Sequence, residues 1–230
     1  MTIVKLHYFK GRGRAETTRW MLAANQIDFV NVPVTTAQEL AALRESGKPP
    51  FGQMPVLEID GLCLSQSSAM IRYLARKGGF YGSSDIDALW CDMLAGVVAD
   101  FAEVPMAAVF QPTLAHAEAN IRAALGKFGP HFEKRLAVNG DWLAGSKLSF
   151  ADVVMAEAMT HAVEWVPDLL AGSPLAAHRE RVCDQAGIAA YLASPQRWPR
   201  PDDHYVIDVA QVLQRALPPH FPHTLRFVTG

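Results

Sequence analysis

Residues 5–16 (KLHYFKGRGRAE) contain the transition that decides the fold of this 230-residue chain. Apolar and polar side chains alternate over residues 3–8, which predicts a β-strand. Two glycines then interrupt the strand pattern, and residues 14–25 have a helical composition. The apolar, β-branched run 29–34 predicts a second strand. Such a succession is a βαβ unit, in which the two strands are parallel and the crossover is right-handed.

The next fifty residues complete a small α/β unit. A short helix is expected over residues 38–46. The Asp60-Gly61 pair between apolar runs 56–59 and 62–64 is typical of a tight antiparallel hairpin. A further helix is expected over residues 65–76, before a pair of glycines. The order βαβ-α-ββα predicts a mixed sheet with helices on both faces, which is the thioredoxin-like arrangement.

From residue 85 onward the sequence has helical periodicity and no convincing strand. We therefore predict a thioredoxin-like domain over residues 1–80, a linker at 79–84 and an all-helical domain over 85–230. The expected helices of the second domain run at about 85–109, 115–138, 149–166, 175–183, 186–193 and 204–217.

Composition and charge narrow the range of partners. Half of the residues are hydrophobic, and 21 basic residues nearly balance 23 acidic ones, for a formal charge of −2. Without a dense basic run, nucleic acid and anionic membranes are poor candidates as partners.

The start of the chain does not look like a secretory signal, and no apolar stretch reaches about 18 residues. We therefore expect a cytoplasmic protein without a membrane span. The three cysteines form no Cys-x-x-Cys pair, which argues against a metal site or dithiol chemistry.

Four segments resemble one family in the same order and spacing. Residues 5–16 closely resemble the N-terminal motif of cytosolic glutathione transferases, the alpha class above all. Residues 51–61 (FGQMPVLEIDG) are similar to the segment that carries the family's cis-proline, and residues 64–67 (LSQS) to its γ-glutamyl-binding turn. Parts of 97–152 extend the likeness into the helical domain. The resemblance implies glutathione as co-substrate and an enzyme that transfers it to electrophiles.

Glutathione conjugation requires a thiolate at neutral pH. An ordinary thiol with a pKa near 8.5 is only about 3% ionised at pH 7, and lowering that pKa by about 2 units requires ~2.7 kcal/mol. One hydrogen bond to a charged group contributes ~1.5–3 kcal/mol, and a helix N-terminus ~0.3–1 kcal/mol. The resemblance assigns the hydroxyl to Tyr8, which ends the first strand. Arg14, at the start of the next helix, is expected to add positive charge near the sulfur.

The resemblance also implies which residues hold glutathione. In addition to Tyr8 and Arg14, the expected contacts are Arg44, Gln53, Met54, Pro55, Gln66, Ser67, Asp100 and Lys127. Asp100 and Lys127 correspond to positions that reach glutathione from the partner subunit. Lys127 stands where the alpha class usually has arginine, so it lacks the bidentate fork. Phe51 resembles an aromatic key that enters a pocket of the neighbouring subunit, with a local core position as the alternative. These positions imply a homodimer.

The second substrate is expected to be a hydrophobic small molecule. The positions that match the family's electrophile pocket are Phe9, Gly13, Val104, Met106 and Phe110, although several of them would also suit a helix core. The apolar face of 203–217 is expected to cover this pocket, and residues 218–230 to lie over or beside its entrance.

Two alternatives share this site. A glutathione-dependent isomerase would use the same thiolate to move a proton along an unsaturated, steroid-like ketone. A non-catalytic ligand-binding relative would keep the fold without activity. The intact set of Tyr8, Arg14, Gln53, Pro55, Gln66 and Ser67 argues against it.

Overall fold

The computed structural model describes residues 3–217 and residue 221. Its sheet has the strand order β2-β1-β3-β4. β1 and β2 are parallel, whereas β3 is antiparallel to both β1 and β4. The strands are β1 (Val4–Phe9), β2 (Phe29–Val34), β3 (Val56–Ile59) and β4 (Leu62–Ser65). The predicted mixed sheet is confirmed.

The β3–β4 turn follows from its two central residues. Asp60 and Gly61 both have positive φ, at 53° and 77°. Two consecutive positive φ angles suit the right-handed twist of a two-residue hairpin, and Asp-Gly is a favoured pair for them. The local sequence therefore fixes the register of β3 and β4, in which Ile59 faces Leu62.

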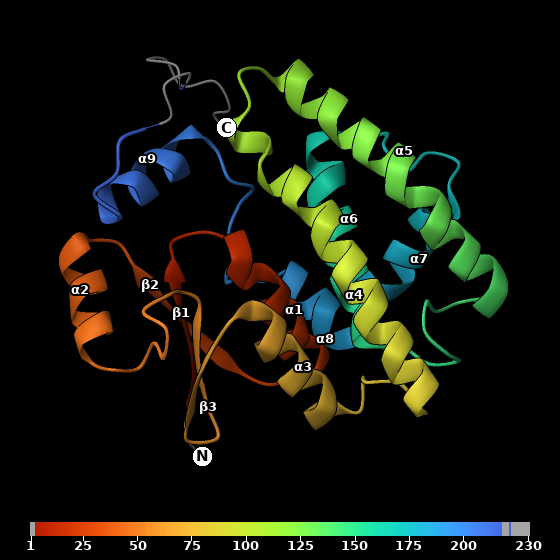
Figure 1. Cartoon of the computed structure of the whole chain (residues 1–230), viewed down its shortest axis with the longest axis horizontal. Coiled ribbons are helices and arrows are strands. Elements are labelled where there is room, and N and C mark those ends of the chain that lie inside the picture. The colour runs from red at the N-terminus through yellow and green to blue at the C-terminus, as the bar shows by residue number, and fades with distance from the viewer. Residues whose placement is uncertain (1–2, 218–220, 222–230) are drawn as a thin grey trace.

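Helices cover both faces of the sheet (Figure 1). α1 and α3 lie between the sheet and the helical domain, and α2 lies on the opposite side. A 3₁₀ turn (η1) links β1 to α1. The bounds are η1 Gly13–Ala15, α1 Glu16–Ala24, α2 Ala37–Glu45 and α3 Ser67–Gly78.

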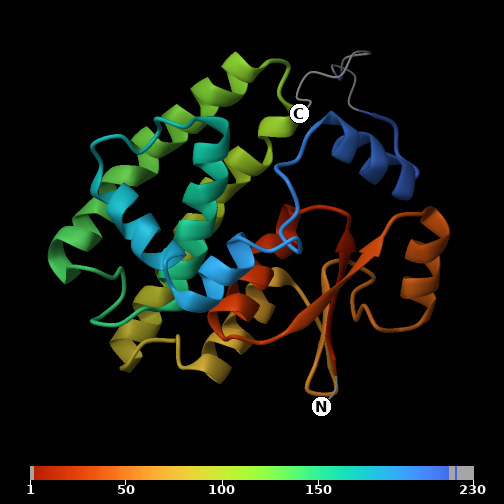
Figure 2. The ribbon, with the colours of Figure 1, turned by 180° about the vertical axis from the view of Figure 1, so that it is seen from behind.

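The helical domain is built around α6, whose side chains are almost all buried. α6 packs on α4, α7 and α1 (Figure 2). The buried side chains of both domains belong to one continuous apolar core. The bounds are α4 Asp85–Met106, η2 Ala108–Phe110, α5 Leu114–Asn139, α6 Phe150–Trp165, α7 Pro174–Cys183, α8 Ala186–Leu192 and α9 Asp203–Val212. The predicted fold class, a thioredoxin-like domain followed by helices, is confirmed.

The last helix is shorter than the sequence suggests. α9 ends at Val212 rather than 217, because Gln214 has a φ of 52° and its neighbour Arg215 donates its N–H to Ala210. Leu217, the last residue of the apolar segment 203–217, therefore lies beyond α9 and is 40% exposed. α9 contacts α2 of the first domain and η2 of the helical domain, so it bridges the two domains (Figure 1).

The segment from α4 to η2 (Asp85–Phe110) is long and apolar enough to span a membrane, because an 18-residue window within it has a mean hydropathy of 1.7. The same length and composition are found in core helices of soluble proteins. α4 packs on α5 and α6, and Leu94, Val98 and Phe101 lie in the core. A core helix is therefore the simpler interpretation of this segment.

Candidate active site

Tyr8 lies near the end of β1 with its hydroxyl at the start of η1. The side chain is buried, and its oxygen accepts the Arg14 backbone N–H at 3.1 Å. Gly13 has a φ of 40°, and a Cβ at that position would lie 2.5 Å from the Tyr8 oxygen. Only glycine fits there. Burial raises the pKa of Tyr8 above its ordinary value, so the phenol keeps its proton at neutral pH.

The Arg14 side chain reaches α4. Its guanidinium donates to both carboxylate oxygens of Glu103, at 2.8 and 3.1 Å. Both side chains are about half exposed, so the pair contributes little stability on its own. The pair places a positive group beside Tyr8, at the junction of η1 and α4.

A second group of expected residues meets at the N-terminus of α3. The Gln66 amide donates to the Gln53 side-chain oxygen at 2.9 Å. Gln66 is the N-cap of α3 with a φ of 68°, and Ser67 is its first helical residue. The Met54–Pro55 peptide bond before β3 is cis. The structure thus places Gln53, Gln66 and Ser67 together, next to the loop that carries Met54 and Pro55.

The loop before β3 carries two further candidates. Arg44, near the C-terminus of α2, donates from Nε to the Gly52 carbonyl at 3.2 Å. Phe51 is 69% exposed. A side chain this open is not part of a local core, which removes the alternative interpretation of Phe51.

A cavity of about 300 Å³ opens beside Tyr8 and Arg14. Four of the expected electrophile-pocket residues line it, namely Phe9, Gly13, Met106 and Phe110. α9 supplies another wall through Tyr205, Val206 and Val209. The cavity is largely apolar, and Tyr8, Arg14, Glu103, His161 and Tyr205 provide its polar groups.

Val104 lies elsewhere. It lines a separate groove between α4 and α5, together with Asp100 and Lys127. Within one chain, neither Asp100 nor Lys127 lines the cavity that contains Tyr8. Lys127 places its ammonium 4.6 Å from the centre of the Phe128 ring.

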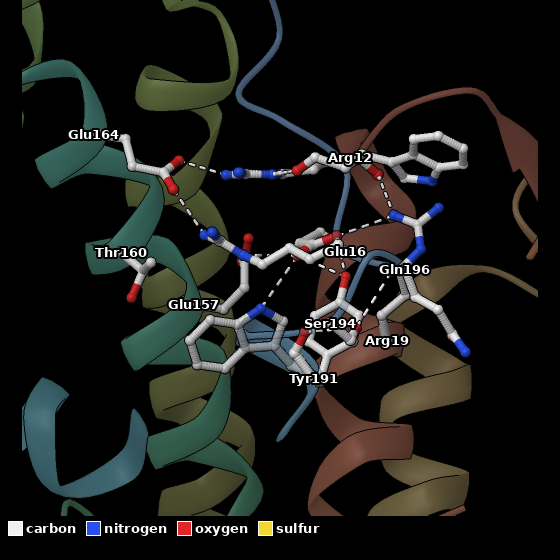
Figure 3. A network of polar contacts seen from close by, with 12 residues as sticks. Arg12, Glu16, Arg19, Glu157, Thr160, Glu164, Tyr191, Ser194 and Gln196 are labelled. Atoms are coloured by element: carbon white, nitrogen blue, oxygen red, sulfur yellow. Dashed lines mark hydrogen bonds and ion pairs between the residues drawn. The ribbon is translucent and has the colours of Figure 1, made fainter. Parts of the chain in front are cut away.

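A buried polar network beneath η1 was not foreseen from the sequence (Figure 3). Arg12 forms an ion pair with Glu164 of α6. Glu16 accepts from Arg19 at 3.0 Å and from the Tyr191 hydroxyl of α8, also at 3.0 Å. These contacts anchor the loop that carries Gly13 and Arg14 to the helical domain.

Two carboxyl groups in this region have pKa values that are shifted in opposite directions. Burial, followed by the charge of Glu16, raises the pKa of Glu157 to about 8. Burial also tends to raise the pKa of Glu164, but the charges of Arg12 and Arg197 outweigh it and lower that pKa. Glu157 is therefore a neutral acid at pH 7, whereas Glu164 is a carboxylate.

Tyr205 was also missed. Its spacing of four residues from Val209 was the available signal, because side chains at i and i+4 lie on the same face of a helix. Within 3–217 and 221, no group of three or more His, Cys, Asp or Glu side chains is arranged to hold a metal ion. Cys63, Cys91 and Cys183 are free thiols.

Comparison with known proteins gives a consistent family assignment. Residues 4–76 match the glutathione S-transferase N-terminal domain, and residues 100–195 match a glutathione S-transferase C-terminal domain. Glutathione S-transferase alpha-3 of Rattus norvegicus is 36% identical over 214 residues, or 90% of this chain and 96% of the relative. Glutathione S-transferase A1 of Homo sapiens is 34% identical, over 85% of this chain and 91% of the relative.

Solved structures of relatives have the same architecture. The protein NaGST-2 superposes with a TM-score of 0.75 at 29% identity, over 85% of this chain and 98% of the relative. Na-GST-3, a monomeric glutathione S-transferase of Necator americanus, superposes with a TM-score of 0.73 at 28% identity, over 83% and 96% of the two chains.

Proposed function

We propose, from the premise that the chain belongs to the glutathione S-transferase family, that Tyr8 donates its phenolic proton in a hydrogen bond to the sulfur of bound glutathione. The observation that carries this proposal is the position of the Tyr8 hydroxyl. It lies at the end of β1, bonded to the Arg14 N–H, on the wall of a cavity between the domains.

The energetics of the site are sufficient for a thiolate. A raised pKa keeps Tyr8 protonated, so it stabilises the sulfur as a donor and does not act as a base. A donor to an anion contributes ~1.5–3 kcal/mol, which corresponds to a lowering of the thiol pKa by about 1–2 units. The Arg14 guanidinium adds positive charge at the same end of the cavity.

The rest of glutathione would lie along the edge formed by the β3 loop and α3. Free N–H groups at the start of α3, at Gln66 and Ser67, suit the γ-glutamyl carboxylate. Met54 and Gln53 would hold the peptide backbone, and Arg44 the glycyl end. With glutathione there, the sulfur faces Tyr8 and the apolar cavity.

The apolar cavity receives the second substrate. Its Phe9, Met106 and Phe110 side chains suit a hydrophobic electrophile. The thiolate lone pair forms a C–S bond to the electrophilic carbon. In a substitution, the bond to the leaving group breaks and its electron pair departs with that group. In an addition, the π pair of the activated double bond moves to the neighbouring carbon, which then takes a proton from solvent. This would be a detoxification reaction of a cytosolic enzyme whose glutathione-binding domain spans 1–80 and whose helical domain spans 85–230.

We further propose that the functional unit is a homodimer. α4 exposes a stripe of apolar side chains at helical spacing, and Phe51 is open to solvent on the preceding domain. The stripe consists of Ile86, Leu89, Met93 and Val97, which are 36–64% exposed. Asp100 and Lys127, which lie outside the Tyr8 cavity of their own chain, would contact glutathione in the partner.

The test is a Tyr8→Phe variant with glutathione bound. We expect glutathione-affinity retention to persist and the pKa of the bound thiol to rise by about 1–2 units. From a thiol pKa near 6.5, this rise should reduce turnover at pH 6.5 by about 5- to 50-fold. Ultraviolet absorbance of the thiolate gives the pKa. An unchanged titration would exclude this role for Tyr8.

A second experiment separates conjugation from isomerisation. It incubates the enzyme and glutathione with a panel of electrophiles and Δ5-ketosteroids and identifies the products.

A further inference from the structure

A second cavity adjoins the one that contains Tyr8. This interdomain cavity has a volume of about 130 Å³ and is bounded by α1, α3, α4 and α6. The residues that line both cavities are Gly13, Arg14, Glu103, Met106 and His161. The space beside Tyr8 and the interdomain cavity therefore share one wall.

One face of α6 forms the inner side of the interdomain cavity. Val154, Glu157, Ala158 and His161 line it, and residues spaced by three or four positions lie on one face of a helix. Of these four, His161 is also part of the wall of the cavity that contains Tyr8. The His161 imidazole therefore lies where the two cavities meet.

His161 carries a polar atom that the fold leaves unused. Its Nε2 is buried and has no hydrogen-bond partner among the residues that the structure describes. The neighbouring carboxyl group of Glu157 differs in this respect, because it accepts from the Thr17 hydroxyl at 3.2 Å. Buried polar atoms are paired in the great majority of cases, since an unpaired one costs free energy. A ligand that pairs with Nε2 would recover that free energy.

The local charges favour an uncharged ligand group at this junction. Burial lowers the pKa of His161 to about 4, despite the opposing charge of Glu164, so the imidazole is neutral at pH 7. A neutral imidazole has one N–H donor and one acceptor nitrogen. Arg14 and Glu103, the charged side chains on the shared wall, pair with each other at 2.8 and 3.1 Å. The junction therefore suits a hydroxyl or an amide better than a carboxylate or an ammonium group.

We infer that His161 is a specificity-determining residue for the second substrate, whose Nε2 forms a hydrogen bond with a hydroxyl or carboxamide group of an otherwise hydrophobic electrophile. The inference rests on the proposed function, because the electrophile must lie beside Tyr8 for the glutathione sulfur to attack it. In a largely apolar pocket, a few well-placed polar groups fix the orientation of the ligand. His161 thus favours electrophiles that carry such a group over those that are purely hydrocarbon around the reacting carbon.

The experiment compares matched pairs of benzyl chlorides as substrates of the full chain with glutathione. One member of each pair carries a hydroxymethyl group and the other an ethyl group, at the ortho, meta or para position. The two members share the reacting carbon, the leaving group and nearly the same size, so the ratio of their kcat/KM values measures recognition of the hydroxyl. We expect the ratio of hydroxymethyl to ethyl to fall about 5- to 150-fold in His161→Leu for at least one position.

Two further variants and two further measurements serve as controls. His161→Gln keeps a donor and an acceptor on a side chain of similar length, so it should restore the preference for the hydroxymethyl member. Met106→Leu changes the shared wall with little change in volume, so it should affect both members of a pair alike. The pKa of the bound thiol should be the same in His161→Leu as in the parent. Urea unfolding of His161→Leu should show no loss of stability, because the substitution removes a buried polar atom without a partner.

Four results would overturn the inference. An unchanged ratio in His161→Leu at all three positions would show that Nε2 does not recognise the hydroxyl. A fall in His161→Gln or Met106→Leu as large as in His161→Leu would show that the shape of the cavity decides the preference. A shifted thiol pKa or a loss of stability in His161→Leu would indicate an effect on the site as a whole. Failure of the proposed function is seen separately, as an unchanged thiol pKa in Tyr8→Phe.

Discussion

The hydroxyl of Tyr191, on α8, lies 3.0 Å from each carboxylate oxygen of Glu16, on α1. The two residues are 175 positions apart in the chain and both are buried. Burial and the charge of Glu16 raise the pKa of Tyr191, so it remains a donor at neutral pH. This contact joins the last third of the chain to the helix that follows the Tyr8–Arg14 loop.

Removing this donor should destabilise the protein. In Tyr191→Phe, the Glu16 carboxylate keeps its bonds from Arg19 and from Trp20 but loses the phenol. A buried hydrogen bond to a charged group contributes ~1.5–3 kcal/mol. We expect a loss of that order in the free energy of unfolding, measured by urea denaturation at one protein concentration.

The matched control is Tyr73→Phe. Tyr73 also donates to a carboxylate, that of Asp60 at 2.6 Å, but this pair is exposed. Its loss should cost no more than ~1 kcal/mol. Equal losses in the two variants would mean that the Glu16 network does not depend on burial.

The raised pKa of Glu157 should make the free energy of unfolding depend on pH. Its pKa in the folded protein is about 8, raised first by burial, whereas an unfolded glutamate titrates near 4.3. Between these values the folded protein retains a proton that the unfolded chain releases. Stability should therefore fall as the pH rises through this window.

Glu157→Gln preserves the shape of the neutral acid and the bond from the Thr17 hydroxyl at 3.2 Å, but it cannot ionise. We expect the variant to match the parent near pH 4.5 and to be more stable by on the order of 5 kcal/mol at pH 8.5. Urea unfolding at pH 5, 7 and 8.5 gives the difference. A difference that does not change with pH would refute the raised pKa.

Glu39→Gln supplies a control of opposite sign. Bonds from the Thr35 backbone and hydroxyl lower the pKa of Glu39. Its contribution is present above the unfolded pKa and is lost as the pH falls through the folded pKa. This variant should therefore be less stable than the parent at neutral pH and approach it in acid.

Local signals explain which parts of the fold were predictable. Asp60-Gly61 fixes a hairpin because two adjacent residues carry the turn conformation. The end of α9 gave no such signal, because the apolar period continues past Gln214, whose positive φ ends the helix. Val104 and Met106 line different cavities because positions two apart on a helix point to different faces, which the sequence alone could have shown.

The residues of the candidate site also fall into those that local motifs predict and those that only the tertiary structure reveals. Tyr8, Arg14, Gln53 and Gln66 belong to compact motifs, and the structure places them in two neighbouring clusters. Tyr205 and the Tyr191–Glu16 pair depend on contacts across more than 170 residues. No local pattern encodes such a contact, because it arises only when the helical domain packs on α1 and η1.

Phe51 should control the oligomeric state. It is 69% exposed in the single chain, and an aromatic anchor buried in a partner's pocket typically costs at least ~2 kcal/mol when truncated. In Phe51→Ala each dimer loses two such anchors, so we expect the dimer dissociation constant to rise at least about 1,000-fold. Sedimentation velocity over a concentration series measures it. Val138→Ala on α5, at an identical 69% exposure, should leave the constant unchanged. A parent protein that sediments as a monomer, as the hookworm relative Na-GST-3 is described, would refute the dimer and with it the role of Asp100 across the interface.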